Sequence, residues 1–399
     1  MINVIFYDLP RVHADLLPMT FTRPVADFRI GITTIREKWA MMLPQDCRYG
    51  YRTVGFLVKK YKAEEIDDNL FIAGNVVPNP TLVEEVLRLE IGEALFKGDD
   101  FIAYRGVSPD MHADNYMKKE YNGECLVLHY LFDIFLNNGA VIKQDFEMIT
   151  KGRTSCALSA SNTVIGDPDL VFVEEGAYVE GAFLNTNGGP IYIGKDAQVM
   201  EGSCVRGPMA LCEHSNINMG SKIYSDTTIG PWSKVGGELN NVVVFGYSNK
   251  AHDGFLGNAV IGEWCNIGAG TNASNLKNDY SKIRVWNYPD HTFMRTDLQF
   301  CGLIMGDHSK VGINCMFNTA TVVGVGVNIH GSGFPRTFIP SFSEGSPVGG
   351  FTDVQLKKFF DIANRAMARR GLLRTDLDDE IFEEIYKIAD TYKYVVGVW

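Results

Sequence analysis

An aliphatic side chain recurs at every sixth residue in the middle of the chain, and this spacing constrains the fold more than any other feature. The repeat runs without a break through eight positions: Ile193, Val199, Val205, Leu211, Ile217, Ile223, Ile229 and Val235. The same six-residue step separates Val173 from Val179 upstream and Ile261 from Ile267 downstream, and it resumes at Met305. A period of six is not that of a helix. It indicates a stack of short repeated units.

Hexads of this kind build a parallel β-helix. Each hexad forms one short strand and a tight corner, and three hexads close a triangular coil of about 18 residues. Glycine often follows the aliphatic residue, as in Ile193-Gly194 and Ile229-Gly230, and lets the backbone turn the corner. We therefore predict a β-helix domain over residues 155–345.

The phase breaks between Val235 and Ile261, and again between Ile267 and Met305. Segments that leave a rigid scaffold often carry function, so we expect a loop at each break. The second break is polar, contains Pro289, and is too long for a simple corner. We predict that residues 272–300 form an arm projecting from the prism.

The flanking regions have a different character. Residues 1–150 mix apolar strand-like runs with amphipathic stretches, which predicts an α/β domain. Residues 350–399 predict two helices, one opened by a capping box at Thr352–Gln355 and continuing to about Arg370, the other over Asp376–Tyr392.

Charge and hydropathy narrow the possible partners. The chain has 37 Lys and Arg against 48 Asp and Glu, a net charge of -11, with no basic stripe, which argues against nucleic-acid binding. No apolar run reaches the roughly 18 to 20 residues of a bilayer span, and the first residues lack the order of a signal peptide. We expect a cytoplasmic protein without a membrane partner.

Two segments resemble a known family. Residues 249–280, NKAHDGFLGNAVIGEWCNIGAGTNASNLKNDY, resemble the acetyltransferase half of the bifunctional glucosamine-1-phosphate acetyltransferase/N-acetylglucosamine-1-phosphate uridylyltransferase family. The segment TFTRPVADFRIGITTIREKW resembles a Bacteroidetes form of it, a sugar nucleotidyltransferase with a hexapeptide-repeat acyltransferase domain. The strong part of the resemblance covers about 160–340. It implies a left-handed coil, acetyl-CoA as cosubstrate, and a homotrimer in which a neighbour's arm completes each active site.

His252 is the candidate catalytic residue. An enzyme that acetylates an amine must remove the amine proton, and histidine is suited to that role near neutral pH. The resemblance implies that His252 is this general base. The alternative is a surface-loop histidine without a role.

Six further residues are candidates for substrate binding. The basic ones suit a sugar phosphate, and the amides and the carboxylate suit sugar hydroxyls or the amine. They are Arg206, Glu238, Lys250, Asn266, Asn275 and Lys282. The resemblance supports Arg206, Glu238 and the two asparagines directly, and Lys282 within about one position. The alternatives are solvated basic side chains and asparagines that favour β-helix corners.

Four positions depart from the family pattern. Phe255 and Leu276 replace tyrosines, Asn240 replaces a lysine, and Ile313 replaces a serine that contacts coenzyme A. The scaffold and base persist while sugar-phosphate contacts change, which leaves the sugar open.

The N-terminal domain lacks the glycine-rich loop with which nucleotidyltransferases hold a triphosphate. Arg11 and Arg23 are candidate nucleotide contacts, and Asp8 is either a magnesium ligand or a cap. We find no Asp pair for magnesium and predict no metal site, so magnesium would be needed only if nucleotidyl transfer is retained.

Three functions follow. The leading one is an acetyl-CoA-dependent acyltransferase acting on an amino-sugar phosphate, as used in nucleotide-sugar biosynthesis. The second is a sugar-1-phosphate nucleotidylyltransferase that uses NTP and magnesium. The third is a non-catalytic scaffold.

Overall fold

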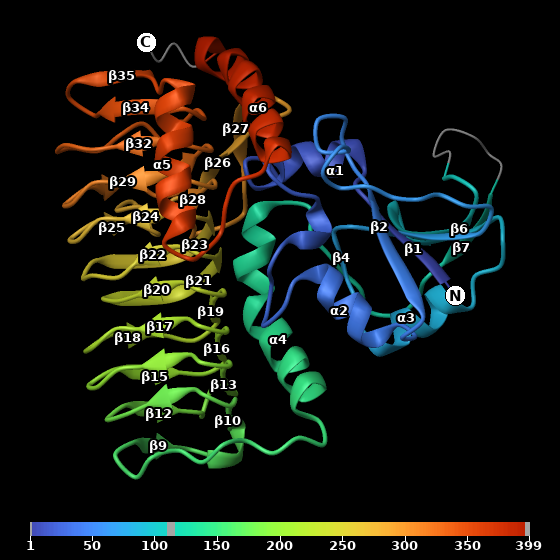
Figure 1. Cartoon of the computed structure of the whole chain (residues 1–399), viewed down its shortest axis with the longest axis horizontal. Helices are drawn as coiled ribbons and strands as arrows, with labels where there is room; N and C mark the ends of the chain where they lie inside the picture. Colours follow the sequence, from blue (N-terminus) through green and yellow to red (C-terminus); the bar gives the residue numbers. More distant parts are fainter. Residues whose placement is uncertain (1, 110–115, 396–399) are drawn as a thin grey trace. The chain divides into compact units, whose positions relative to one another are not determined.

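The computed structural model describes residues 2–109 and 116–395 and divides the chain into two compact units (Figure 1). The first unit comprises Met1–Phe28 and Thr33–Tyr130, and the second comprises Arg29–Ile32 and Leu131–Trp399. The α/β region, the parallel β-helix of hexapeptide repeats and the helical tail that the sequence predicts are all present.

The first unit is built on a six-stranded sheet of mixed direction, in the order β2-β1-β3-β6-β5-β7. Its strands are β1 (Ile2–Tyr7), β2 (Cys47–Arg52), β3 (Asn69–Ala73), β5 (Glu93–Lys97), β6 (Asp100–Gly106) and β7 (Met117–Glu120). Its helices are α1 (Pro10–Asp15), α2 (Ile35–Met42) and α3 (Pro80–Leu87), and a small pair is formed by β4 (Val76–Val77) and β8 (Leu126–Val127). Thr34 caps α2 through a capping box with Glu37.

The second unit is a three-faced prism of stacked coils. Face 1 contains β10 (Val171–Val173), β13 (Ile191–Ile193), β16 (Met209–Leu211), β19 (Thr227–Ile229), β28 (Ile304–Met305), β31 (Val322–Val323) and β33 (Phe338–Ile339). Face 2 contains β9 (Thr163–Ile165), β12 (Phe183–Asn185), β15 (Cys204–Arg206), β18 (Lys222–Ile223), β25 (Asn272–Ala273) and β30 (Met316–Phe317). The strands β21 (Glu238–Gly246) and β23 (Phe255–Glu263) run through both faces.

Face 3 is a separate ladder. Its strands are β11 (Tyr178–Val179), β14 (Gln198–Val199), β17 (Asn216–Ile217), β20 (Lys234–Val235), β22 (Asn249–Lys250), β24 (Asn266–Ile267), β29 (Lys310–Val311), β32 (Asn328–Ile329), β34 (Ser343–Ser346) and β35 (Gly350–Asp353). All of them pair in parallel except β34 with β35.

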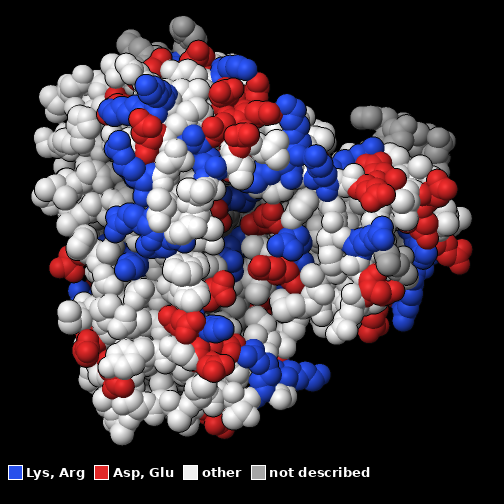
Figure 2. Space-filling view, in the orientation of Figure 1, with Lys and Arg blue, Asp and Glu red and all other residues white. Residues whose placement is uncertain are grey.

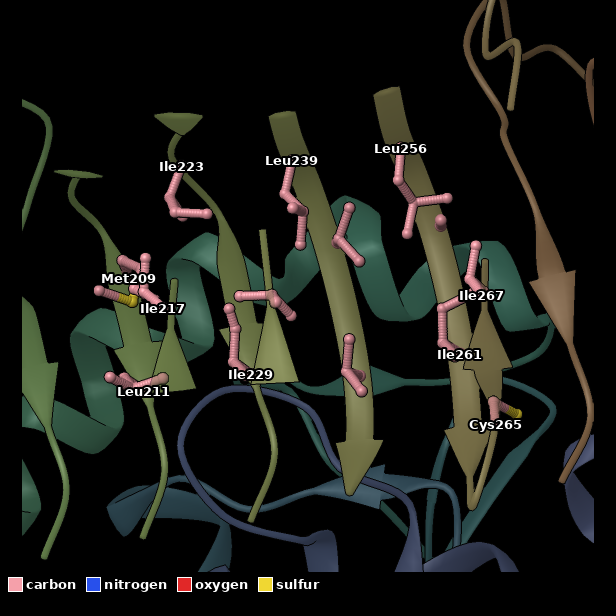
Figure 3. Packing of buried hydrophobic residues seen from close by; sticks show 14 of the residues in the cluster. Met209, Leu211, Ile217, Ile223, Ile229, Leu239, Leu256, Ile261, Cys265 and Ile267 are labelled. Atoms are coloured by element: carbon pink, nitrogen blue, oxygen red, sulfur yellow. The ribbon is translucent and has the colours of Figure 1, made fainter. Parts of the chain in front are cut away.

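The hexad residues form the interior of the prism (Figure 3). Ile193 is paired with Leu211, and Leu211 with Ile229, so that equivalent side chains stack one coil apart. The eight unbroken positions from Ile193 to Val235 are each at most 1% exposed. Burial of this apolar column is the main stabilising term of the domain.

The first break in the repeat is not a loop, and that expectation is wrong. Ile229 is paired with Val244 and Val235 with Lys250, so this coil is closed by 15 residues instead of 18. The shortening is made possible by β21, which passes from face 2 to face 1 as one continuous strand.

The second break does hold an inserted arm, because Ile267 is paired with Val311. The arm contains an antiparallel hairpin of β26 (Arg284–Asn287) and β27 (Thr292–Arg295). It packs back on its own chain: Trp286 stacks on Phe338 at 4.1 Å between ring centroids, and Tyr288 is 2% exposed. The sequence alone suggests an arm that projects freely, but in the structure the hairpin packs against the rest of the chain.

Three helices accompany the prism: α4 (Leu131–Thr150), α5 (Leu356–Ala368) and α6 (Asp376–Val395). The contacts of α4 place it with the β-helix, although a boundary at residue 150 would assign it to the first domain. Thr352 lies in β35, and α5 begins only after Gln355, which makes no side-chain cap. The predicted capping box is thus wrong, because the segment is held as a strand by β34.

Candidate functional site

His252 lies on the corner that joins face 3 to face 2, between β22 and β23. Its side chain is exposed, and its ring makes no hydrogen bond with any residue that the structure describes. The turn beneath it is Gly236-Gly237, where an added Cβ would approach Ala251 O at 2.4 Å and the Asp253 Cα at 2.9 Å. Glycine is required there because the two turns are stacked in close contact.

Lys250 lies inside the prism, whereas a phosphate contact would have to lie at the surface. It occupies an interior position of the prism, in register with Val235, and is 5% exposed. Its Nζ donates to Gly236 O at 2.9 Å and to His252 O at 2.6 Å. Burial lowers the pKa of Lys250 to about 8, against the opposing charge of Asp253. Lys250 therefore holds the His252 turn from inside and does not reach a substrate phosphate.

Glu238 begins β21 on face 2, and Asn275 follows β25 at the far end of the same face. The backbone N-H of Glu238 donates to Gly254 O at 3.2 Å, and its half-buried carboxylate has only Lys222 near it, with Oε2 and Nζ 3.9 Å apart. Asn275 Nδ2 donates to Asn258 Oδ1 at 2.8 Å and lies over Gly257 together with the Phe255 ring. A carboxylate and an amide are thus presented on the face that follows the His252 turn.

Asn272 is a neighbour that the sequence analysis missed. Its Oδ1 accepts from the backbone N-H of Phe255 at 2.8 Å, and its Nδ2 donates to Gly270 O at 2.9 Å. These bonds fix the strand that follows the His252 turn. The only signal in the sequence is its place in the NASN run.

Three other candidate substrate-binding residues lie away from His252. Arg206 is exposed on β15, two coils below β21 along face 2, which corresponds to roughly 10 Å at the spacing of stacked strands. Asn266 points outward from face 3, in register with Asn249 and Lys310. Lys282 lies in the arm, where its Nζ donates to Asp297 O.

The departures from the family pattern lie mostly at the surface. Ile313 is 68% exposed and Asn240 is exposed on face 2. Leu276 forms an isolated bridge with Phe300 at the base of the arm.

In the first unit, Asp8 is fully engaged by protein donors. Its Oδ1 accepts from the backbone N-H of Val25 at 3.0 Å, and its Oδ2 accepts from Thr53 Oγ1 at 2.6 Å and lies 3.3 Å from His13 Nδ1. This carboxylate links the end of β1 to Val25, His13 and Thr53.

The two candidate nucleotide contacts differ in their surroundings. Arg11 donates through Nε to Asp15 Oδ2 at 2.8 Å, while Arg23 is only 5% exposed. Within residues 2–109 and 116–395, no group of three or more His, Cys, Asp or Glu side chains is arranged to hold a metal ion.

A basic cavity beside α5 is a further feature that the sequence analysis did not find. It lies between α5 and face 3 and is lined by cations from both. The run Arg365-Ala-Met-Ala-Arg369-Arg370 carries the signal, since residues four apart share a helix face.

No helix in the part of the chain that the structure describes is both long and apolar enough to cross a bilayer.

Comparison with known proteins gives three kinds of finding. Residues 4–154 match the family model described as sugar nucleotidyl transferase. No curated protein matches the sequence of this chain. Among solved structures, similarity is found to UDP-N-acetylglucosamine acyltransferase from Francisella novicida, at 15% identity and a TM-score of 0.30, covering 59% of this chain and 76% of that one.

Two further structures are similar. The UDP-N-acetylglucosamine acyltransferase of Bacteroides fragilis is 16% identical with a TM-score of 0.25, covering 60% of this chain and 84% of that one. AntD, an N-acyltransferase from Bacillus cereus in complex with dTDP-4-amino-4,6-dideoxyglucose and coenzyme A, is 12% identical with a TM-score of 0.22, covering 53% and 91%.

The N-terminal residues 4–154 resemble sugar nucleotidyl transferases, and a β-helix of hexapeptide repeats follows them in the same chain.

Proposed function

We propose that the chain transfers an acetyl group from acetyl-coenzyme A to the amine of an amino-sugar phosphate resembling glucosamine-1-phosphate. The observation that carries the proposal is the exposed His252 ring, which makes no hydrogen bond with a described residue, on a turn held in place by Lys250. The resemblance of residues 249–280 to an acetyltransferase adds to it.

In the proposed reaction, His252 acts as the general base that accepts the proton of the amine. The amine nitrogen attacks the thioester carbonyl, its proton passes to His252, and the C-S bond breaks as the amide C-N bond forms. The proton returns to the departing coenzyme A sulfur. Backbone N-H donors stabilise the oxyanion formed in between.

Two residues of face 2 suit the acceptor. The Glu238 carboxylate can accept from the sugar amine or hydroxyls, and the Asn275 Oδ1, which makes no hydrogen bond with a described residue, can accept a second one. Phe255 offers an apolar surface in place of a phenolic hydroxyl, which is why we leave the particular sugar open.

We expect a neighbouring subunit to complete the site. The His252 ring has no group in the described part of its own chain that would orient it, and Arg206 lies about two coils from Glu238. A neighbouring subunit would supply the missing contacts in the trimer that we predict.

The test is release of free coenzyme A from acetyl-CoA in the presence of glucosamine-1-phosphate and other amino sugars, one at a time. Release that depends on the acceptor identifies both the reaction and the sugar. The absence of release with every acceptor would contradict the proposal.

A second function is favoured by the family match of residues 4–154, namely nucleotidyl transfer to a sugar-1-phosphate. Pyrophosphate release from NTP, magnesium and a sugar-1-phosphate tests it. If neither coenzyme A nor pyrophosphate is released, the scaffold function remains.

A further inference from the structure

The cavity beside α5 has a volume of about 300 Å³, at the small end of the range for ligand pockets. Face 3 contributes Asn249, Asn266 and Lys310 from three successive coils, and α5 with the residues after it contributes the other wall. A stacked pair of rings, Tyr247 and Trp264, with centroids 4.4 Å apart, lines it as well.

The charge of this cavity is opposite to that of the protein. Its lining contains four cations and no carboxylate, in a chain of net charge -11. The cations are Lys310, Arg365, Arg369 and Arg370. Figure 2 shows Lys and Arg side chains gathered over the C-terminal end of α5.

Two of these arginines have no partner in the part of the chain that the structure describes. Arg365 and Arg369 make no hydrogen bond or salt bridge with any residue in the described ranges, and both are exposed at the cavity. They are four residues apart on one helix face, so their guanidinium groups can act on the same ligand.

The guanidinium of Arg370 is partly buried, incompletely hydrogen-bonded and close to a like charge. Its Nη2 makes only long hydrogen bonds, at 3.3 Å to Trp232 O and 3.5 Å to Asn249 Oδ1, and its buried Nε has no partner among the described atoms. Burial and the neighbouring charge of Arg369 lower the pKa of Arg370. A guanidinium that is partly desolvated beside a like charge is stabilised when an anion is bound.

Attraction to the helix dipole explains only part of this arrangement. Cations are favourable at the last turn of a helix, but Lys310 belongs to the β-helix. Its Nζ is held at the cavity by Trp264 O at 2.5 Å and His308 O at 3.0 Å. The β-helix therefore contributes the positive charge of Lys310 to the cavity that the arginines line.

We propose that this cavity binds the phosphate groups of a phosphorylated small molecule through Arg365, Arg369, Arg370 and Lys310. Guanidinium forks match phosphate oxygens in geometry and charge, and the asparagine amides add neutral donors. Two sources carry such phosphates, the acyl donor and a nucleotide, and they differ in the position of the phosphate on the ribose. The inference does not depend on acyl transfer, because binding is measured without turnover.

Isothermal titration calorimetry with three separate probes tests the site: adenosine 3′,5′-bisphosphate, UDP and inorganic pyrophosphate. We expect at least one probe to bind, with an affinity that falls as salt is raised. Preference for the bisphosphate assigns the site to the acyl donor, and preference for UDP assigns it to a nucleotide. Failure of all three to bind at low salt overturns the proposal.

Variants locate the binding. Arg365→Ala and Arg369→Ala are each expected to weaken binding about tenfold, since a hydrogen bond to a charged group contributes roughly that much. Lys357→Ala is the matched control, because Lys357 is an exposed cation on α5 that lies outside the cavity and has no partner among the described residues. Circular dichroism and Tm show whether each variant is folded. Undiminished binding in both arginine variants, or equal weakening in the control, overturns the proposal.

Discussion

Lys250 places an ammonium group inside a prism whose neighbouring interior positions are apolar. The residues one coil away on either side are Val235 and Ile267. The charge is compensated by two backbone carbonyls, one of which belongs to His252. A pKa of about 8 instead of 10.5 corresponds to a cost on the order of 3 kcal/mol at neutral pH.

This cost has a defined pH dependence. Between pH 8 and 10.5 the unfolded chain binds a proton at Lys250 that the folded chain has lost, so stability rises with pH across this window. Below pH 8 the full cost is present.

We predict that Lys250→Met is more stable than the wild type at pH 7, by about 2 kcal/mol, because the buried charge is removed. The difference should narrow between pH 8 and 10.5. Urea unfolding at a series of pH values measures both. A variant that is less stable than the wild type at pH 7 contradicts this account.

The same variant should be less active. Without the ammonium group, His252 O loses its donor and the turn is no longer fixed, so we expect kcat for acyl transfer to fall roughly tenfold. A rise in stability combined with a loss of activity separates positioning from general unfolding. Unchanged kcat would show that Lys250 has no part in placing His252.

The residue scale also shows why Lys250 could not be placed from the sequence. Interior positions in this region are Leu239, Val244, Lys250, Leu256 and Ile261, separated by five or six residues. Lys250 lies 15 residues after Val235, which is not a multiple of six, so the period does not predict an interior position for it. A strict period predicts the regular coils well and fails where a corner is deleted.

At the scale of elements, the segment Arg29–Ile32 belongs to the β-helix unit although its neighbours in sequence do not. The backbone N-H of Gly31 donates to Asn138 Oδ1 at 2.7 Å, and its carbonyl accepts from Thr228 Oγ1 at 2.9 Å. Asn138 Nδ2 also bonds Thr228 Oγ1 at 3.0 Å, so this segment is clamped between α4 and face 1.

We predict that Gly31→Ala destabilises the protein by about 3 kcal/mol. Gly31 has φ +71°, and an added Cβ would lie 2.5 Å from Asp145 Oδ2 and 2.6 Å from Val141 Cγ1. Gly220→Ala is the control, since Gly220 has φ +68° but open space around it.

The control should lose only about 1 kcal/mol, the cost of the backbone conformation. The difference between the two variants in urea unfolding isolates the steric part. Equal losses of unfolding free energy in the two variants would mean that the residues around Gly31 move aside at no cost.

The elements were predictable to different degrees. The coils follow from the aliphatic period because each hexad buries one side chain, and the arm follows from the length of the second break. The contact of the arm with Phe338 and the strand at Thr352 depend on partners distant in sequence, which periodicity does not report.

At the scale of the whole molecule, the chain joins two regions with different chemical character. The family match at residues 4–154 covers the first unit and α4, and the β-helix carries His252. The candidate catalytic histidine was predicted from the motif around it, whereas the cavity beside α5 was not, because its cations come from α5 and from a strand about 55 residues earlier.

We predict a homotrimer in solution. The resemblance implies one, and His252 has no orienting group in the described part of its own chain. Light scattering should give three times the mass of the chain. A monomer that retains full acyl transfer would contradict the inference that a neighbour completes the site.

The two regions should also be separable in function. If the first unit transfers nucleotides, His252→Ala should leave pyrophosphate release unchanged while acyl transfer is lost. A parallel loss of both activities would indicate that the substitution damages the whole protein.

The most direct test of the central claim is the rate of coenzyme A release by the wild type, His252→Ala and His330→Ala. His330 is a matched control, an exposed histidine on the same side of face 3, three coils along from β22. We predict that His252→Ala loses about 100-fold or more in kcat, the usual contribution of a general base, while His330→Ala keeps the wild-type rate. Equal rates in the wild type and His252→Ala would contradict the account.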